Sequence, residues 1–500
     1  MKRSGFLRNS LRYPCRGITV PSCPPIFRWH QQPPRRRNVA VRTVMTSTTD
    51  DNPYFQYQPI EQVERLERYK IGGYHPIYVG DVLNSRYKVI DKLGHGTFST
   101  IWLSRDEQKA AYVAVKVSTG DASTHEAKIL GMLKDRCLVH PNGRPLIPVI
   151  LDEFQIEGPN GHHQCIVTAP AQGSVSTALF CCYFQLETTR VLTAELALAV
   201  AFVHAQGFVH GDIHLGNILL NLPTSLDKLS VQDFYEQFGE PYTEPVVRLD
   251  GQPLPPGVPT CGTMPTWLGK RAKDILPFEA QLLLSDFGES FSPSDPEQRR
   301  RGQDCPSPLP VIPPEAYFEP DKPLSFPSDI WSLACAMYSM FGLRGLFDAT
   351  FATRHGIASQ QVDIIGDIPL EWWNTWEKRH EYFEEIGRPK KDRFVYPSLE
   401  QEFEKYIQAA RERDNMSSFD KEEQVAILSM LRSMLAMRPE KRATATDVLS
   451  SDWMVTWGLP AVKRARDSRQ TGGVSHCKKA DSRSSLVVLA SSVALERIYS

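Results

Sequence analysis

The feature that most constrains this chain is a polar loop between two apolar runs, Val209-His-Gly-Asp-Ile-His-Leu-Gly-Asn217 followed by Ile-Leu-Leu220. Its Asp212 and Asn217 stand five residues apart. A carboxylate can orient a hydroxyl group, and an amide oxygen can bind Mg²⁺. A second carboxylate, Asp286, follows the apolar run Leu283-Leu-Ser. We therefore expect Asn217 and Asp286 to share a magnesium ion and Asp212 to act on a hydroxyl group.

Two motifs nearer the amino terminus add a way to bind phosphate. Leu93-Gly-His-Gly-Thr-Phe-Ser-Thr-Ile101 joins two strand-like runs, and glycine lets a backbone approach phosphate and offer N–H donors. Val113-Ala-Val-Lys116 places a lysine in an apolar strand, which is costly unless its ammonium meets anions. Lys116 is expected to contact phosphates and the Glu126 carboxylate on the following helix. A hairpin turn or an edge-strand lysine explains either motif alone, but not all of these motifs in this order.

Two later segments predict charge contacts that stabilise the rest of the fold. Ser328-Asp-Ile-Trp-Ser332 opens a buried helix, where Asp329 is expected to cap the backbone of the loop around Asp212. Glu315, in Pro313-Pro-Glu315, is expected to pair with Arg442. A solvated pair of charges is the alternative.

Hydrophobic periodicity predicts a small sheet followed by a mostly helical region. Strands are expected at residues 87–93, 99–103, 113–117 and 165–168, with a helix at 125–133. Buried helices are expected at 192–204, 330–340 and 422–434. The expected parts are a basic arm at 1–50, an extension at 51–86, a β-rich lobe at 87–170, a helical lobe at 171–458 with a surface-loop insertion at 221–280, and a basic flexible tail at 459–500.

Charge is distributed unevenly, although the net charge is only −1. Residues 1–49 contain ten Lys or Arg and no acid, and residues 461–500 contain eight basic and three acidic side chains, so the body between them is acidic. An acidic body would attract basic substrates and repel nucleic acid, although a charge that serves only solubility is the simpler explanation. The Arg-rich opening is either a mitochondrial transit peptide or a disordered arm.

Cysteine spacing and hydropathy exclude two further classes of protein. The ten cysteines form no Cys-x-x-Cys pair with matching ligands, which disfavours a zinc site and suits a reducing compartment. No apolar run reaches the roughly 18 residues that a membrane span needs. No membrane span is therefore expected.

The segment 73–103 carries a resemblance to a known family. Its Gly-Tyr-His-Pro opening, the pair Gly80-Asp81 and a glycine-rich loop that ends in Phe98-Ser-Thr resemble the entry to the SR-protein kinases. The likeness continues through the loop around Asp212 to about Trp453. Residues 221–280 lie where this family has its spacer. The chain thus resembles a divergent, fungal-type serine/threonine kinase of this family.

The resemblance implies an α+β, two-lobe protein-kinase-like fold that transfers the γ-phosphoryl group of ATP, with Mg²⁺, to a protein. It implies a catalytic set of Lys116, Glu126, Asp212 and His214, and a metal site of Asn217 and Asp286. The residues implied to line ATP are Leu93, Gly94, Gly96, Thr97, Phe98, Ser99, Ile101, Lys116, Ala169 and Ala171. The resemblance implies a location in the cytoplasm or nucleus. We also expect a monomer that acts on a basic protein substrate and does not bind nucleic acid directly.

Gly211 stands where many kinases have the arginine that binds an activation-loop phosphate, and the SR-protein kinases commonly lack that arginine. Without it, such a phosphate would have no cationic partner at this site. Activity is therefore expected not to depend on phosphorylation between Gly288 and Pro313.

Two departures from the family leave other functions open. His214 stands where such kinases have lysine, and a neutral imidazole is a poorer counter-charge for the γ-phosphate. The segment before Pro314 lacks the arginine and aromatic pattern that SR-protein kinases use near their substrate, so a preference for Arg-Ser repeats does not follow. The loop around Asp212 also resembles those of small-molecule kinases and of the atypical kinases of quinone biosynthesis. An ATP-binding pseudokinase scaffold is the remaining alternative.

Overall fold

The computed structural model describes residues 56–134 and 146–473, apart from residues 349, 351, 367 and 386. These residues all fall within one compact unit, 54–500. The expected basic arm at 1–50 and the end of the expected tail, 474–500, lie outside the described residues.

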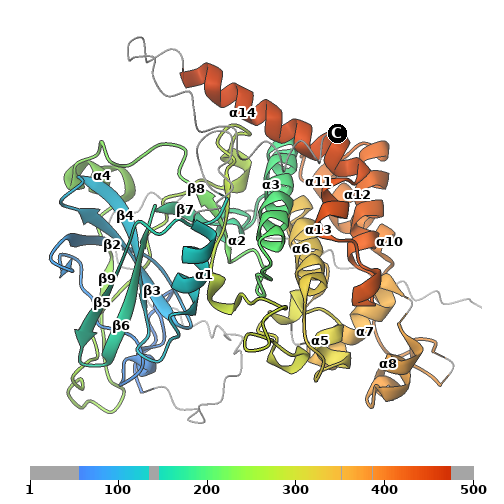
Figure 1. Cartoon of the computed structure of the whole chain (residues 1–500), viewed down its shortest axis with the longest axis horizontal. Coiled ribbons are helices and arrows are strands. Elements are labelled where there is room, and N and C mark those ends of the chain that lie inside the picture. Colours follow the sequence, from blue (N-terminus) through green and yellow to red (C-terminus); the bar gives the residue numbers. More distant parts are fainter. Residues whose placement is uncertain are drawn as a thin grey trace, which may run out of the picture. The chain divides into compact units, whose positions relative to one another are not determined.

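The small lobe is an antiparallel sheet whose six strands run in the order β1-β2-β3-β4-β6-β5 (Figure 1). The strands are β1 (Val82–Leu83), β2 (Tyr87–Gly96), β3 (Ser99–Asp106), β4 (Ala111–Ser118), β5 (Asp152–Gly158) and β6 (Gly161–Thr168). The four predicted strands lie within β2, β3, β4 and β6. Strand β5 was not predicted, because only two of its seven residues are large and apolar.

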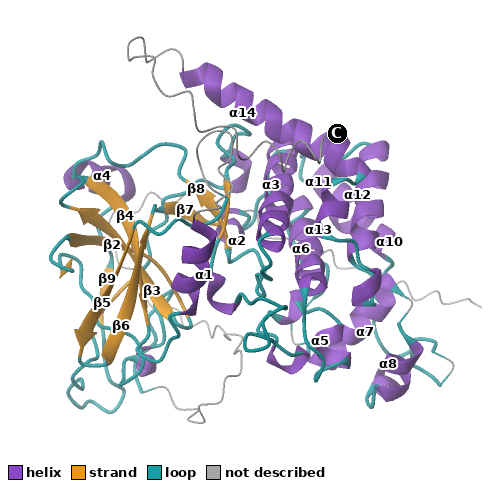
Figure 2. Ribbon diagram, in the orientation of Figure 1, coloured by secondary structure: helices purple, strands orange, loops and turns teal. Residues whose placement is uncertain are grey.

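Helix α1 (His125–Lys134) lies between the sheet and the helical lobe (Figure 2). Its Ile129, Leu130 and Leu133 repeat at helical spacing and are buried in one apolar cluster with side chains of the larger lobe. This burial fixes the helix that carries Glu126 relative to both lobes.

The larger lobe is built around two buried helices, α3 (Leu186–Ala205) and α6 (Phe326–Phe341). The predicted helices lie within α3, α6 and α12 (Lys421–Met434). Further helices of this lobe are α2 (Val175–Ala178), α5 (Glu315–Phe318), α7 (Arg354–Ile365), α8 (Leu370–Thr375), α9 (Arg379–Tyr382), α10 (Leu399–Phe403), α11 (Ala409–Arg413) and α13 (Ala445–Leu449). None of the helices in the described part of the chain combines the length and the apolar character needed to span a bilayer.

A small antiparallel sheet positions the loops that carry the predicted site. Its strands are β7 (Ala171–Ser174), β8 (Ile218–Asn221) and β11 (Leu282–Leu284), in the order β11-β8-β7. Strand β8 begins directly after Asn217, and Asp286 follows β11 by two residues. The antiparallel pairing of Ile218 with Leu284 therefore brings the two predicted metal-binding residues to the same end of the sheet.

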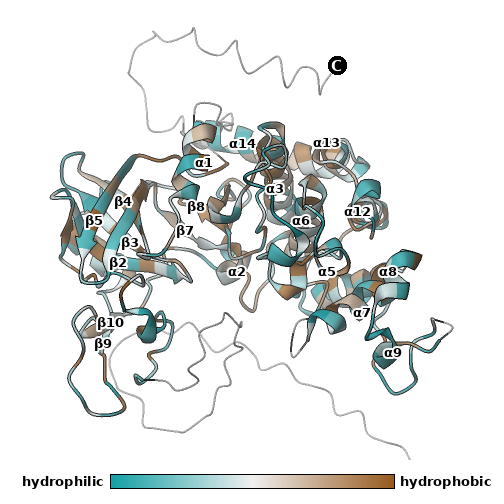
Figure 3. Cartoon of the chain, turned by 60° about the horizontal axis from the view of Figure 1, so that its bottom comes forward, coloured by the Kyte–Doolittle hydropathy of each residue, from teal (hydrophilic) through white to brown (hydrophobic). Residues whose placement is uncertain are grey.

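The insertion at 221–280 is more ordered than the surface loop that we expected. It contains α4 (Val231–Phe238) and the antiparallel pair β9 (Thr243–Pro245) and β10 (Cys261–Thr263). Figure 3 shows this pair of strands from a second side. Phe234 of α4 is fully buried and packs in a cluster with Ile90, Leu103 and Tyr112 of the main sheet. The helix has an apolar face, and the sheet offers an apolar surface to bury it.

The carboxyl-terminal segment also differs from the expectation. Residues 459–473, expected to begin a flexible tail, form helix α14 (Leu459–Gly473). Ala461 and Ala465 are buried against the larger lobe, and Arg464 pairs with Glu187 of α3 at 2.7 Å. The prediction of a flexible tail was wrong for these residues, because it rested on their basic composition and not on the apolar side of this helix.

Candidate active site

Lys116 lies between two carboxylates that come from different elements. Its Nζ is 2.6 Å from Oε2 of Glu126 and 3.0 Å from Oδ1 of Asp286. Burial alone would lower the pKa of the ammonium, but the two carboxylates outweigh burial and raise it above its ordinary value. The predicted pair of Lys116 and Glu126 is confirmed, and the lysine stays charged.

Asp286 adopts a left-handed backbone conformation with φ +65°. Aspartate tolerates this region better than most residues, and here its carboxylate meets Lys116. Burial would raise the pKa of this carboxyl group, but the adjacent ammonium outweighs burial and lowers it. Half of the side chain, 49%, remains exposed, so oxygen is accessible to a ligand. Phe287 N–H donates to Oε1 of Glu126 at 3.3 Å, which links α1 to this segment.

Asn217 connects the two predicted aspartates. Its Nδ2 donates to Oδ2 of Asp212 at 3.1 Å and to the Asp212 carbonyl at 3.0 Å. The backbone N–H and the hydroxyl of Ser285 donate to the Asn217 carbonyl at 2.8 and 2.9 Å, one residue from Asp286. Lys116, Glu126, Asp212, Asn217 and Asp286 therefore converge on one site.

His214 lies beside the same carboxylate. Its Nδ1 accepts the Gly216 N–H at 3.0 Å, and its Nε2 lies 3.5 Å from Oδ2 of Asp212. Because Nδ1 accepts, the ring hydrogen belongs on Nε2, which faces the aspartate. The imidazole is thus close to Asp212, at the position where the resemblance to SR-protein kinases implies a lysine.

Asp329 of α6 holds the backbone that leads into the site. Its carboxylate accepts the His210 N–H at 2.7 Å and the Gly211 N–H at 2.9 Å, so the predicted cap is confirmed. Burial would raise its pKa, but His204 and these donors lower it below the ordinary value. Sequence reasoning missed His204, because it ends a helix that is otherwise strongly apolar. The buried pair of Glu315 and Arg442, 2.6 Å apart, is also confirmed.

The glycine-rich loop is the hairpin between β2 and β3. Gly94 and Gly96 lie in β2, and an added Cβ at either position would meet no atom within 4 Å. This open backbone fits a close approach by phosphate. Leu93 precedes the two glycines, Thr97 and Phe98 form the turn, and Ser99 and Ile101 belong to β3. Ala169 follows β6, and Ala171 begins β7 of the smaller sheet.

The donor set at the site fits a hard divalent cation. Asp286 offers carboxylate oxygen, and Asn217 uses its NH₂ group toward Asp212, which leaves the amide oxygen as a ligand. Mg²⁺ needs only one or two protein oxygens when phosphate supplies others. Among the described residues, no group of three or more His, Cys, Asp or Glu side chains suited to a metal occurs.

A protein kinase domain model matches residues 87–235. The chain is 25% identical over 448 residues to a serine/threonine protein kinase of Aspergillus fumigatus, covering 86% of this chain and 97% of that protein. It is 26% identical over 415 residues to the kinase SRPK of Physarum polycephalum, covering 78% and 91%. Over a shorter 169 residues it is 34% identical to SRSF protein kinase 3 of Homo sapiens, covering 32% and 30%.

This chain is a divergent, SRPK-like protein kinase. The sheet of the small lobe, the helical larger lobe and the matched domain agree with the predicted two-lobe α+β fold. Within that fold, Glu126 on α1 is paired with Lys116, and Phe287 is buried behind Asp286. The ion pair of Lys116 and Glu126 is thus formed in this structure of the kinase.

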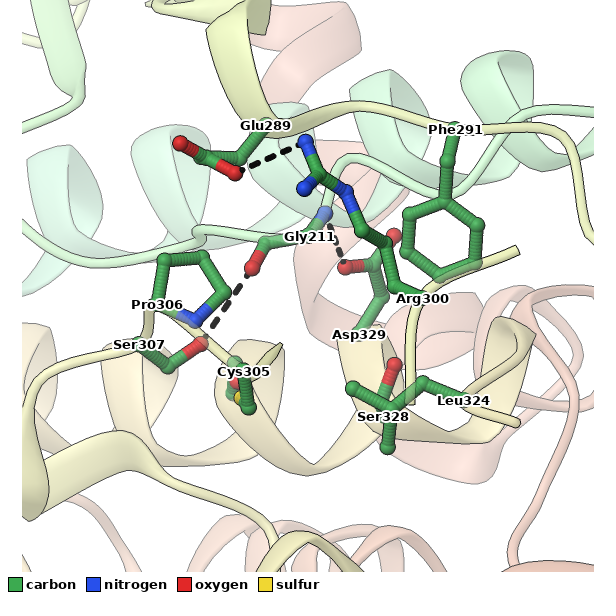
Figure 4. Close-up of a pocket in the computed structure, with 11 residues that line it drawn as sticks. Gly211, Glu289, Phe291, Arg300, Cys305, Pro306, Ser307, Leu324, Ser328 and Asp329 are labelled. Carbon is green, nitrogen blue, oxygen red and sulfur yellow. Dashed lines mark hydrogen bonds and ion pairs between the residues drawn. The ribbon is translucent and has the colours of Figure 1, made fainter. Parts of the chain in front are cut away.

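Gly211 shows why this kinase lacks the arginine found before the catalytic aspartate in many kinases. Its φ is +84°, and an added Cβ would lie 2.7 Å from the Glu289 carbonyl oxygen, so only glycine fits. A cavity of about 10 Å³ lies beside it, and Arg300 at its edge pairs with Glu289 at 3.1 Å (Figure 4). Arg300, the cation that lines this cavity together with Gly211, thus already has a carboxylate partner.

A larger cavity, of about 520 Å³, lies on the other face of the main sheet. It is lined by Val113 and Val167, which alternate along their strands with Lys116 and Ile166, and it also reaches Ala169. Its lining contains none of the residues Lys116, Asp212 or Asp286. This cavity is therefore separate from the group of catalytic candidates.

Proposed function

We propose that this kinase transfers the γ-phosphoryl group of ATP to serine or threonine hydroxyls of a protein. The observation that carries the proposal is the continuous set of contacts from Glu126 through Lys116 to Asp286, beside the pair of Asn217 and Asp212. These groups supply a phosphate-binding cation, oxygen ligands for a metal ion and a carboxylate for the acceptor hydroxyl.

In the proposed mechanism, Lys116 positions the α- and β-phosphates while Glu126 holds its ammonium in place. Asp212 accepts a hydrogen bond from the acceptor hydroxyl and takes its proton as the new oxygen–phosphorus bond forms and the bond to ADP breaks. The Asn217 NH₂ group limits the rotation of this carboxylate. Asn217 and Asp286 would hold a magnesium ion, which supplies charge neutralisation for the β- and γ-phosphates.

The proposed substrate is a basic protein, because the body of the chain between its basic ends is acidic. The relatives' names support serine or threonine as the acceptor. We extend the proposal to a location in the cytoplasm or nucleus, since the relatives give no support to a mitochondrial location. We also propose that the kinase is a monomer.

A direct test follows transfer from γ-labelled ATP by the purified full-length chain. The acceptors are an Arg-Ser peptide, a neutral Ser peptide and, separately, an aminoglycoside. Label on phosphoserine, with the Arg-Ser peptide preferred, supports the whole proposal. Label on the small molecule alone, or ATP binding without any transfer, would replace it by the small-molecule kinase or the pseudokinase.

The matched control separates chemistry from binding. Asp212→Asn keeps the shape of the side chain and removes its charge, so turnover should fall by about two or more orders of magnitude with ATP binding nearly intact. Asp274→Asn changes an exposed aspartate that pairs with Arg271 and should leave turnover unchanged.

A further inference from the structure

Two side chains of the extension before the matched kinase domain contact the tip of the glycine-rich loop. The Tyr74 hydroxyl donates to the Gly96 carbonyl at 2.7 Å and lies 3.2 Å from the Thr97 carbonyl. Arg68 donates from Nη1 to the same Thr97 carbonyl at 2.5 Å. Both carbonyl groups at the loop tip are therefore held by residues that lie outside the loop and its strands.

Arg68 also contacts the loop through its flat guanidinium group. Its Cζ lies 5.3 Å from the ring centre of Tyr74 and 5.5 Å from that of Phe98. Phe98 is otherwise 54% exposed at the turn of the hairpin. The cation therefore bridges the extension and the most exposed aromatic side chain of the loop.

The Gly-Gly-Tyr segment fixes Tyr74 beneath the loop. Gly72 has φ +80°, and an added Cβ at Gly73 would lie 1.7 Å from the Arg68 carbonyl oxygen. The same carbonyl accepts the Tyr74 N–H at 3.0 Å, and the Asn160 Nδ2 donates to the Tyr74 carbonyl at 2.7 Å. Tyr74 is only 3% exposed, so its hydroxyl has little freedom to leave the loop.

Strand β2 is held further along by both segments outside the sheet. Lys92 forms an ion pair with Glu64 of the extension, and both side chains are nearly fully buried. The Lys92 carbonyl accepts the N–H of Thr266, in the insertion, at 2.8 Å. The strand leading into the loop is therefore fixed from two sides.

The geometry of the peptide unit links these contacts to nucleotide binding. A planar trans peptide directs its N–H away from its carbonyl oxygen. The Gly96 and Thr97 carbonyl groups point toward the extension. The N–H groups of the same two peptide units, which belong to Thr97 and Phe98, therefore point away from the extension. Neither N–H donates to another group within the described residues. Such N–H groups are the donors that a glycine-rich loop offers to phosphate.

We propose that Tyr74 and Arg68 are positioning residues, which hold the glycine-rich loop with its N–H groups directed at the nucleotide phosphates. The inference rests on the proposed function, because it requires ATP at this site. A loop that is already ordered loses less conformational entropy when phosphate binds, so affinity for phosphate-bearing nucleotides is higher.

The test measures binding of ATP with Mg²⁺, ADP with Mg²⁺ and adenosine to the full-length chain by calorimetry. Tyr74→Phe removes only the hydroxyl and should weaken ATP and ADP binding by about 5- to 10-fold. Arg68→Ala should weaken them similarly, and adenosine, which lacks phosphate, should bind both variants as it binds the wild type.

Tyr78→Phe is the matched control, because its hydroxyl accepts the Thr260 N–H at 3.1 Å and makes no contact with the loop. It should bind all three ligands as the wild type does. ATP binding unchanged in Tyr74→Phe, or adenosine weakened as much as ATP, would overturn the inference.

These outcomes separate the two proposals. A wild-type chain that transfers phosphate, with Tyr74→Phe still binding ATP normally, overturns the positioning role and leaves the proposed function intact. A wild-type chain that binds no ATP overturns both.

Discussion

Arg442 holds Glu315 through two parallel charge-assisted hydrogen bonds, 2.7 Å from Nη1 to Oε1 and 2.6 Å from Nη2 to Oε2. The side chains are 0% and 8% exposed. The same guanidinium donates to the carbonyl oxygens of Ala436, Met437 and Pro327. One side chain thus joins the start of α5 to the turn before α13 and to the first turn of α6.

Replacing Arg442 by lysine should destabilise the larger lobe strongly. An ammonium cannot reproduce the paired bonds or the three contacts with carbonyl groups, so partners are left buried without a donor. We expect a loss of about 3–5 kcal/mol in the free energy of unfolding, seen as a lower unfolding temperature. The control is Arg438→Lys, at an exposed pair with Glu371, which should cost less than about 1 kcal/mol. Equal shifts in the two variants would contradict this assignment.

The serines of the activation segment should differ in their effects on activity. Ser292 and Ser294 contact each other near the surface, whereas the buried Ser290 donates from its hydroxyl to the His210 carbonyl at 3.0 Å. Arg300, the cation among the residues that line the cavity beside Gly211, is already paired with Glu289, so a phosphate on this segment would have to compete for it. The double variant Ser292→Ala/Ser294→Ala should keep wild-type turnover.

Ser290→Ala should lower turnover several-fold in the same peptide assay, because a buried carbonyl two residues before Asp212 loses its donor. The expected independence from phosphorylation between Gly288 and Pro313 therefore does not extend to the structural role of the Ser290 hydroxyl. A large loss of activity in the double variant, restored by acidic residues at the same positions, would show that phosphorylation is required after all.

The site could be predicted from the sequence because its charged side chains require partners of opposite charge. Lys116 in an apolar strand requires anions, and Glu126 and Asp286 provide them. The Tyr74 contact with the glycine-rich loop could not be predicted in this way, since a hydroxyl has no comparable requirement for a given partner. The order of the insertion was underestimated for the same reason. The Tyr235 hydroxyl donates to the Ile90 carbonyl, which lies 145 residues earlier in the chain, and neither group is charged, so neither requires that particular partner. In α14, net basic charge concealed Ala461 and Ala465.

Replacing His214 by lysine should increase turnover. The imidazole Nε2 lies 3.5 Å from Oδ2 of Asp212, so a longer ammonium at this position could reach the γ-phosphate that the acceptor attacks. We expect the kcat for peptide phosphorylation to rise at least about threefold, with a smaller change in the KM for ATP. His162→Lys, an exposed histidine on β6, serves as the control. A lower kcat in His214→Lys would mean that the imidazole acts together with Asp212.

Asp91 predicts how the stability of the kinase depends on pH. Its side chain is buried in β2, where Oδ1 accepts the Lys92 N–H at 2.8 Å and Oδ2 has no partner within the described residues. Burial raises the pKa of this carboxyl group from 3.8 to about 7. Between these values the folded chain binds a proton that the unfolded chain has released, so stability falls as the pH rises. The total loss is up to about 4 kcal/mol.

Asp91→Asn should remove this dependence, because an amide stays neutral at every pH of the experiment. The variant and the wild type should unfold at similar temperatures near about pH 4, and the variant should be the more stable near about pH 8. Scanning fluorimetry across this range measures the difference, with the exposed Asp274→Asn as a control that should follow the wild type. A constant offset between Asp91→Asn and the wild type at all pH values would mean that the carboxyl group is ionised in the folded kinase throughout.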